Sequence, residues 1–266
     1  MALSTLHTTQ LAAAQPAVRK IGLRDITDAI HHGIEDFAAK PTHLYFLALI
    51  YPLATLGAFL VVFNYDLLPL AFPVISGSLL IGPILTIAMC EVSRRRERGE
   101  DISGSGAGNF LRNPAAGDIL VLGGVLLALF CIWVAAAMVI YNMTLGDPWQ
   151  TVAPRSAEEF FMRLISTPEG WTLIVVGNAV GFFFAVTALC ISVVSFPLLL
   201  DRNVGIATAI NTSIRAVQAN PVMMAVWGFL VALALAIAAV PFLVGLAVCV
   251  PVLGHATWHL YRRLVV

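Results

Sequence analysis

Two stretches of the sequence share one pattern: PVISGSLLIGPILTIAMCEVSRR, at residues 73–95, and PFLVGLAVCVPVLGHATWHLYRR, at residues 241–263. Aligned end to end, the two stretches share a first proline, a glycine, a central proline and a final arginine pair: Pro73 with Pro241, Gly77 with Gly245, Pro83 with Pro251, and Arg94–Arg95 with Arg262–Arg263. Each stretch is an apolar run with internal Gly and Pro that stops at two arginines. This pattern is typical of a membrane helix that leaves the bilayer on the cytoplasmic side, where Lys and Arg accumulate.

The composition of the 266-residue chain favours the same class of protein. Hydrophobic residues make up 59% of the chain and charged residues 11%, with a mean hydropathy of +0.90, whereas a soluble domain carries about 25% charged residues. The excess lies in uncharged runs of about 18 residues or more, which predict transmembrane helices. The basic residues cluster beside these runs and not along a soluble face, so we expect no nucleic-acid partner.

Six transmembrane helices are predicted, which makes the fold an all-α polytopic membrane protein. They cover residues 44–63, 67–92, 119–141, 171–200, 222–240 and 242–261. Two amphipathic helices, at residues 21–39 and 201–219, precede the first and the fifth span. The apolar face of the first amphipathic helix is predicted to consist of Leu23, Ile26, Ile30, Ile34 and Phe37. Because the opposite face is acidic, we expect this helix to pack against the protein's own spans and not on lipid headgroups.

The order of the elements indicates an internal duplication. An amphipathic helix, a proline, a span outward and a Pro/Gly-rich span back to an arginine pair occur at about residues 21–98 and again at about 201–263. Both copies start on the same side, so they predict a parallel repeat around an axis along the membrane normal. Residues 21–266 are therefore interpreted as a single membrane domain. Residues 1–20 are expected to form a disordered cytoplasmic tail without a cleavable signal peptide.

The basic residues predict the orientation in the membrane. With six spans, 13 of the 15 Lys and Arg residues fall on the side of the two termini, and only Arg155 and Arg163 fall on the other. The positive-inside rule therefore predicts that both termini are cytoplasmic.

Three ionisable residues near the predicted cytoplasmic ends of the second and sixth spans form the candidate site. His255 and His259 lie four residues apart, on one helical face, and Glu91 stands at the position of His259 in the repeat. We therefore expect Glu91, His255 and His259 to face a shared polar niche that could respond to protons or bind a ligand. The alternatives are that Glu91 pairs with Arg94 in its own helix and that the histidines serve polar packing. A metal or haem site is less favoured, because no Cys, Asp or Glu lies near the histidines in sequence, and no cofactor is expected.

Specific motifs at the ends of these spans resemble a known family. They are Gly82–Pro83, EVSRRRERGE at residues 91–100, FPLLLDR at 196–202, Asn220–Pro221 and LGHATWHLYRR at 253–263. Together they resemble a bacterial family of predicted integral membrane proteins, known as domain of unknown function 2189. The resemblance implies a multi-pass protein of the bacterial cytoplasmic (inner) membrane, and it supplies no catalytic residues.

Two classes of function remain open. The sequence contains no P-loop, no G-x-S-x-G, no H-E-x-x-H and no dinucleotide fingerprint, so we do not expect an enzyme. Spans with aliphatic side chains can pack on neighbouring helices but offer few charged groups for chemistry, which favours an accessory, assembly or scaffold component of a membrane complex. We expect such a protein to contact lipid and other membrane proteins or its own copies. A transporter or channel for a small solute or ion is the alternative, favoured by the duplication and by helices rich in Pro and Gly. Against the alternative, no strongly charged residue sits near the predicted bilayer midplane.

Overall fold

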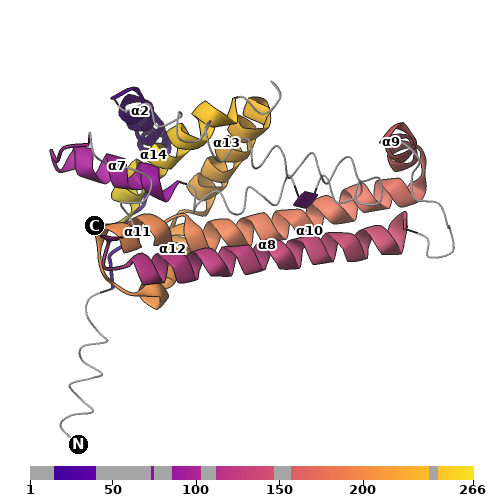
Figure 1. Cartoon of the computed structure of the whole chain (residues 1–266), viewed down its shortest axis with the longest axis horizontal. Helices are drawn as coiled ribbons and strands as arrows, with labels where there is room; N and C mark the ends of the chain where they lie inside the picture. Colours follow the sequence, from indigo (N-terminus) through magenta and orange to yellow (C-terminus); the bar gives the residue numbers. More distant parts are fainter. Residues whose placement is uncertain (1–14, 40–72, 75–85, 103–111, 147–156, 240–244) are drawn as a thin grey trace, which may run out of the picture.

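The structure, a computed structural model, describes residues 15–39, 73–74, 86–102, 112–146, 157–239 and 245–266. These residues form α-helices joined by turns, together with one isolated β-bridge. In chain order the helices are α2 (Leu23–Ala39), α7 (Ile87–Glu97), α8 (Ala116–Thr144), α9 (Ala157–Ser166), α10 (Pro168–Ser192), α11 (Ser195–Asp201), α12 (Ile206–Ala219), α13 (Pro221–Ala239) and α14 (Leu246–Leu264) (Figure 1). The predicted all-α class is confirmed for the described part of the chain.

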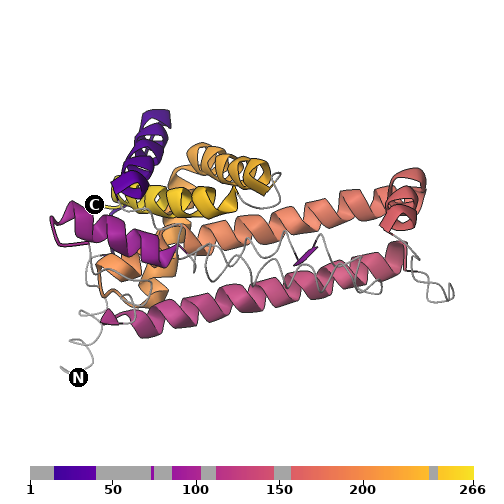
Figure 2. The ribbon, with the colours of Figure 1, turned by 45° about the horizontal axis from the view of Figure 1, so that its top comes forward.

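Two long helices, α8 and α10, lie side by side and run the length of the molecule (Figures 1 and 2). Trp133 of α8 packs on Gly181 of α10, where an added Cβ would lie 3.0 Å from the indole ring. The same ring lies against Phe184, with 5.6 Å between the ring centroids. The glycine therefore makes room for the aromatic side chain that joins the two helices.

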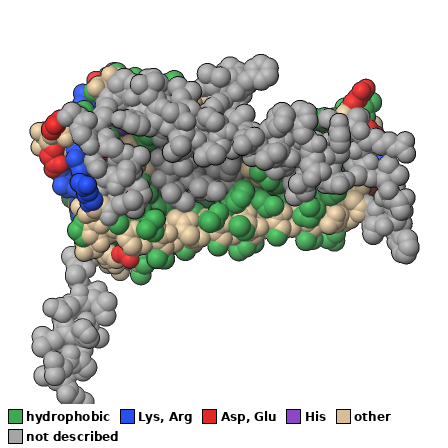
Figure 3. All heavy atoms as spheres, viewed as in Figure 1, with side chains coloured by type: hydrophobic (Ala, Val, Ile, Leu, Met, Phe, Trp, Pro, Cys, Tyr) green, Lys and Arg blue, Asp and Glu red, His purple; other side chains and the backbone are tan. Residues whose placement is uncertain are grey.

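Three stretches of the described residues are long and apolar enough to cross a membrane: residues 116–144, 168–201 (α10 with α11) and 221–238. A bilayer core requires about 20 apolar residues in a helix. Large apolar side chains on these helices stay exposed, among them Leu127, Phe182, Phe183 and Phe229. Figure 3 shows hydrophobic side chains spread along the length of the α8–α10 pair. Exposed apolar helices of this length are the mark of a membrane protein, as predicted.

The three stretches coincide with the predicted third, fourth and fifth spans. The predicted first span, residues 44–63, lies outside the described residues, as does most of the second, whose C-terminal part forms the start of α7. The helix α14 occupies the place of the predicted sixth span. It is less apolar than α8, α10 and α13, because two histidines and two arginines lie in its C-terminal half.

Both predicted amphipathic helices are present, as α2 and α12. The helix α2 packs along α14 so closely that a Cβ on Gly33 would lie 2.7 Å from the backbone nitrogen of Ala256, in agreement with packing against the protein itself. Its predicted apolar face was wrong in part, because Leu23 and Ile34 are exposed. The buried face consists of Ile26, Ala29, Gly33 and Asp36. The helix α12 packs mainly on α10 and α11, whereas α2 packs mainly on α14, so these neighbours do not confirm the predicted repeat.

The described residues before α2 pair with the C-terminus. The backbone N–H of Arg19 donates to the carbonyl of Leu264 at 2.8 Å, the N–H of Val266 donates to the carbonyl of Ala17 at 3.1 Å, and Val18 and Val265 form the antiparallel bridge. The predicted disordered tail comprised residues 1–20, but residues 17–19 make these contacts with the C-terminus. Its last residues complete the hydrogen bonding of the extended C-terminus, and residues 1–14 lie outside the described part.

Candidate functional site

The polar side chains of the bundle gather at one end, where α2, α7, α11 and α14 meet (Figures 1 and 3). The helix α7 begins with apolar residues and carries Arg94, Arg95 and Arg96 in its last turn, which brings positive charge to this end. The helices α2 and α11 supply carboxylates, and α14 supplies the two histidines and Arg262. Two separate polar clusters result, one centred on Asp36 and one on Asp201.

Asp36 of α2 is the centre of the first cluster and only 3% exposed. One carboxylate oxygen pairs with the guanidinium of Arg96, and the other lies 2.8 Å from Nε2 of His259. The side chain of Ser93 also lies near this carboxylate and favours its charged form. Burial by itself would raise the pKa of Asp36, but the contacts with His259, Ser93 and Arg96 outweigh it and hold the pKa well below its usual value. Asp36 therefore stays charged and joins α2, α7 and α14.

His255 lies deeper in the same cluster and is fully buried. Its Nδ1 is 2.8 Å from the Ser93 hydroxyl, which links it through Ser93 to Asp36. Its Nε2 has no hydrogen-bond partner among the described residues. Further out, the ring of His32 lies 5.2 Å from the ring of His259. Polar groups thus run without a break from buried His255, through Ser93 and Asp36, to the partly exposed His259.

Glu91 is buried but does not join this cluster in the described part of the chain. Its carboxylate accepts two hydrogen bonds from Arg94, at 2.8 and 2.9 Å, and one from Arg95 at 2.7 Å. The pairing within α7 is the alternative named above, and it follows from helical spacing, because residues three and four positions apart share one face. The structure therefore brings His255 and His259 together around Asp36 and Ser93, and it places Glu91 with its own arginines.

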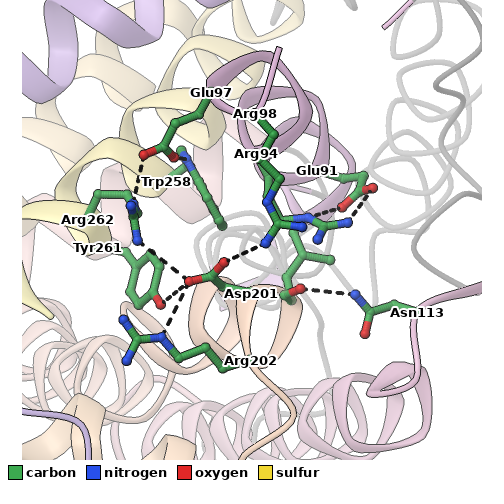
Figure 4. A network of polar contacts seen from close by, with 11 residues as sticks. Glu91, Arg94, Glu97, Arg98, Asn113, Asp201, Arg202, Trp258, Tyr261 and Arg262 are labelled. Atoms are coloured by element: carbon green, nitrogen blue, oxygen red, sulfur yellow. Dashed lines mark hydrogen bonds and ion pairs between the residues drawn. The ribbon is translucent and has the colours of Figure 1, made fainter. Parts of the chain in front are cut away.

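Asp201, at the end of α11, is the centre of the second cluster (Figure 4). Its carboxylate accepts from the hydroxyl of Tyr261 at 2.8 Å and from Arg98 at 3.1 Å, and Arg262 lies 3.7 Å away. Arg262 also donates to Glu97 at 2.9 Å. The indole N–H of Trp258 donates to the second oxygen of Glu97 at 3.0 Å. This cluster therefore ties α7, α11 and α14 together at the same end of the bundle.

Three residues of the first cluster were not among the predicted site residues: Asp36, Ser93 and Arg96. The buried position of Asp36 could have been inferred from the sequence. Asp36 lies three residues after Gly33 and seven after Ala29, a spacing that puts all three on one helical face. Among the described residues, no group of three His, Cys, Asp or Glu side chains is placed to hold a metal ion. The contacts of Asp36, Arg96, His259, Ser93 and His255 form a charged hydrogen-bond network.

Comparison with known proteins locates the chain within a family. The family model described as "Predicted integral membrane protein (DUF2189)" matches residues 71–201. The matched segment contains α7 to α11 and includes Gly82–Pro83, residues 91–100 and all but the last residue of the motif at 196–202. Asn220–Pro221 and residues 253–263 lie beyond it. Comparisons with curated proteins and with solved structures give no match. Over residues 71–201 the chain matches the DUF2189 family of predicted integral membrane proteins.

Proposed function

We propose that the protein crosses the bacterial cytoplasmic (inner) membrane six times, with both termini in the cytoplasm. The distribution of charge supports this orientation. The described basic residues gather at the end of the bundle where α8 begins and α10 ends, which is also the end of the C-terminus (Figures 1 and 3). The exception in the described part is Arg163 of α9, at the opposite end. Cytoplasmic segments of membrane proteins carry this excess of Lys and Arg.

We further propose that the protein is a non-catalytic accessory or scaffold component of a membrane complex. The observation that carries this proposal is that three carboxylates at the polar end of the described part each bind at least two donors of this chain: Asp36, Glu91 and Asp201. Removing one partner of a buried charge pair is costly, so these groups serve to fix the helices at the polar end. The long apolar surfaces are then left for lipid and for other membrane helices.

The helix α13 offers the most open of these surfaces. Little of its apolar stretch is buried in the chain itself, and Val222, Phe229, Leu233 and Ile237 are exposed at spacings of seven and four residues. Such a spacing aligns side chains on one face of a helix. We assign this face to the partner protein or to a second copy of the chain.

Native mass spectrometry and affinity purification in mild detergent test the proposal. A stoichiometric partner or a homo-oligomer is expected, and the double substitution Phe229→Ala with Ile237→Ala should lower its recovery several-fold. The matched control, Phe182→Ala with Phe183→Ala on α10, removes similar exposed apolar area and should retain the partner. A protein that is purified alone, with no partner lost from either variant, would contradict the scaffold function.

A transporter or channel is the second candidate, and one observation favours it. The buried Nε2 of His255 has no partner among the described residues, and it lies at the inner end of the polar path to His259. Buried ionisable groups in membrane proteins often mark proton or solute pathways. If this function holds, proteoliposomes should show solute or proton flux that His255→Leu abolishes and that a substitution of exposed His31 leaves intact.

A further inference from the structure

The helix α9 is a short amphipathic segment at the end of the α8–α10 pair opposite the C-terminus (Figures 1 and 2). Its inward side chains, Phe160 and Leu164, are partly buried. Its outward side chains, Phe161, Met162 and Ile165, are 58%, 55% and 55% exposed. Exposure of this many large apolar groups on a ten-residue helix requires a partner surface.

The contacts at the C-terminal end of α9 fix its position against α10. The Thr167 hydroxyl donates to the carbonyl of Arg163 at 2.8 Å, and the indole N–H of Trp171 donates to the carbonyl of Ile165 at 3.0 Å. A Cβ on Gly170 would lie 2.2 Å from the carbonyl oxygen of Leu164, so glycine allows the two helices to meet. The outward face of α9 is thus presented in one orientation.

The height of α9 along the bundle matches a membrane interface. The 29 residues of α8 span about 44 Å at 1.5 Å per residue, which exceeds the hydrocarbon core of about 30 Å. The far end of α8 therefore reaches the headgroup region. Tyr141, near this end, has its ring 6.4 Å from the ring of Phe160, and Trp171, in the first turn of α10, hydrogen-bonds to Ile165 of α9. Tyr and Trp at one height near the ends of spans form the aromatic belt of a membrane protein.

We propose that α9 is a membrane-interface anchor whose outward face, formed by Phe161, Met162 and Ile165, lies at the boundary of acyl chains and headgroups. Lipid fits this face because it continues the exposed apolar surface of the spans, which includes Met143 of α8 and Val175 of α10. The charges do not favour an anionic surface, since Glu158 is exposed and Arg163 is paired with Glu159 at 2.9 Å. Attachment is therefore hydrophobic and independent of lipid charge.

Photocrosslinking of the full-length protein in nanodiscs of zwitterionic phosphatidylcholine tests this assignment. A benzoylphenylalanine at position 161, and in a second protein at position 165, should give covalent lipid adducts in intact-mass spectra. The control position is Arg163, whose side chain is 37% exposed on α9 but lies about 160° around the helix from both Phe161 and Ile165 at 3.6 residues per turn. Adduct yield at 161 and 165 should exceed that at 163 several-fold.

Three outcomes would overturn the proposal. Equal lipid adducts at 161 and 163 would mean that α9 is not oriented at the interface. Crosslinks from 161 and 165 to a second copy of the chain, or to a co-purified protein, would mean that this face is a protein interface. Yields that rise several-fold when anionic lipid is added would mean that charge, and not apolar contact, attaches the helix. Two separate positions keep the test valid if one substituted protein fails to fold.

Discussion

Replacement of Asp36 by Asn should destabilise the polar end of the bundle by about 2–3 kcal/mol. The substitution keeps the shape of the side chain but removes its charge and puts an N–H₂ group opposite a donor. A hydrogen bond to a charged group contributes about 1.5–3 kcal/mol, and Asp36 accepts such bonds from Arg96 and His259. The loss of stability stays below the sum of these two hydrogen bonds, because the Arg96 side chain is 42% exposed and can hydrogen-bond to water instead.

Unfolding in mixed micelles of mild detergent and SDS, followed by circular dichroism, measures the change in free energy. The matched control is Asp28→Asn on the same helix, whose side chain is 50% exposed and lies 3.4 Å from Arg263. Exposed pairs of this kind contribute about 0.2–1 kcal/mol. Combining Asp36→Asn with Arg96→Met in a double-mutant cycle should give a coupling energy of about 1 kcal/mol or more. If Asp36→Asn costs no more than Asp28→Asn, the buried carboxylate does not hold these helices together.

The same contacts lead to three further predictions. Because the pKa of Asp36 is depressed, the stability that this carboxylate contributes should be complete above pH of about 4 and decrease as the pH falls below that value. Asp36→Asn should remove this part of the acid dependence. An unchanged dependence of the unfolding free energy on pH would refute this prediction. Gly33→Ala should weaken the packing of α2 on α14 by about 1–3 kcal/mol, whereas Gly22→Ala should not, because Gly22 has open space around it. Equal unfolding midpoints of the two variants would contradict the close approach of α2 to α14. Tyr261→Phe removes the 2.8 Å hydrogen bond to Asp201 and should lower the free energy of unfolding by about 1–2 kcal/mol. An unchanged free energy of unfolding would mean that water replaces the hydroxyl of Tyr261.

The helical class and the central spans could be predicted because bilayer length and hydropathy determine them directly. Residues 116–144 and 221–238 each contain an apolar window long enough to cross a membrane, and no tertiary information is needed to recognise them. The buried face of α2 could not be predicted from hydrophobic residues alone. Its contact with α14 is so close that Gly33 and Ala29 occupy the centre, while larger Leu23 and Ile34 remain outside.

The candidate site was predicted in part for a similar reason. The spacing of His255 and His259 correctly placed both on the side of α14 that faces polar groups. The partner of His259 could not be read from the repeat, because Asp36 lies on a helix far away in sequence, and only the packing of α2 on α14 brings it near. Glu91 was placed in the wrong cluster. Two arginines at three and four residues on its own helix are closer competitors for its carboxylate than any group on α14.

The orientation of the two ends of the bundle is the most direct test of this account. A dual reporter that is fluorescent in the cytoplasm and enzymatically active only after export can be fused after Val266 and, in a second protein, after Ser166 at the end of α9. The account predicts a fluorescent, phosphatase-inactive fusion at Val266 and a phosphatase-active fusion at Ser166. Phosphatase activity at Val266, or the same signal at both positions, would contradict six spans with a cytoplasmic polar end.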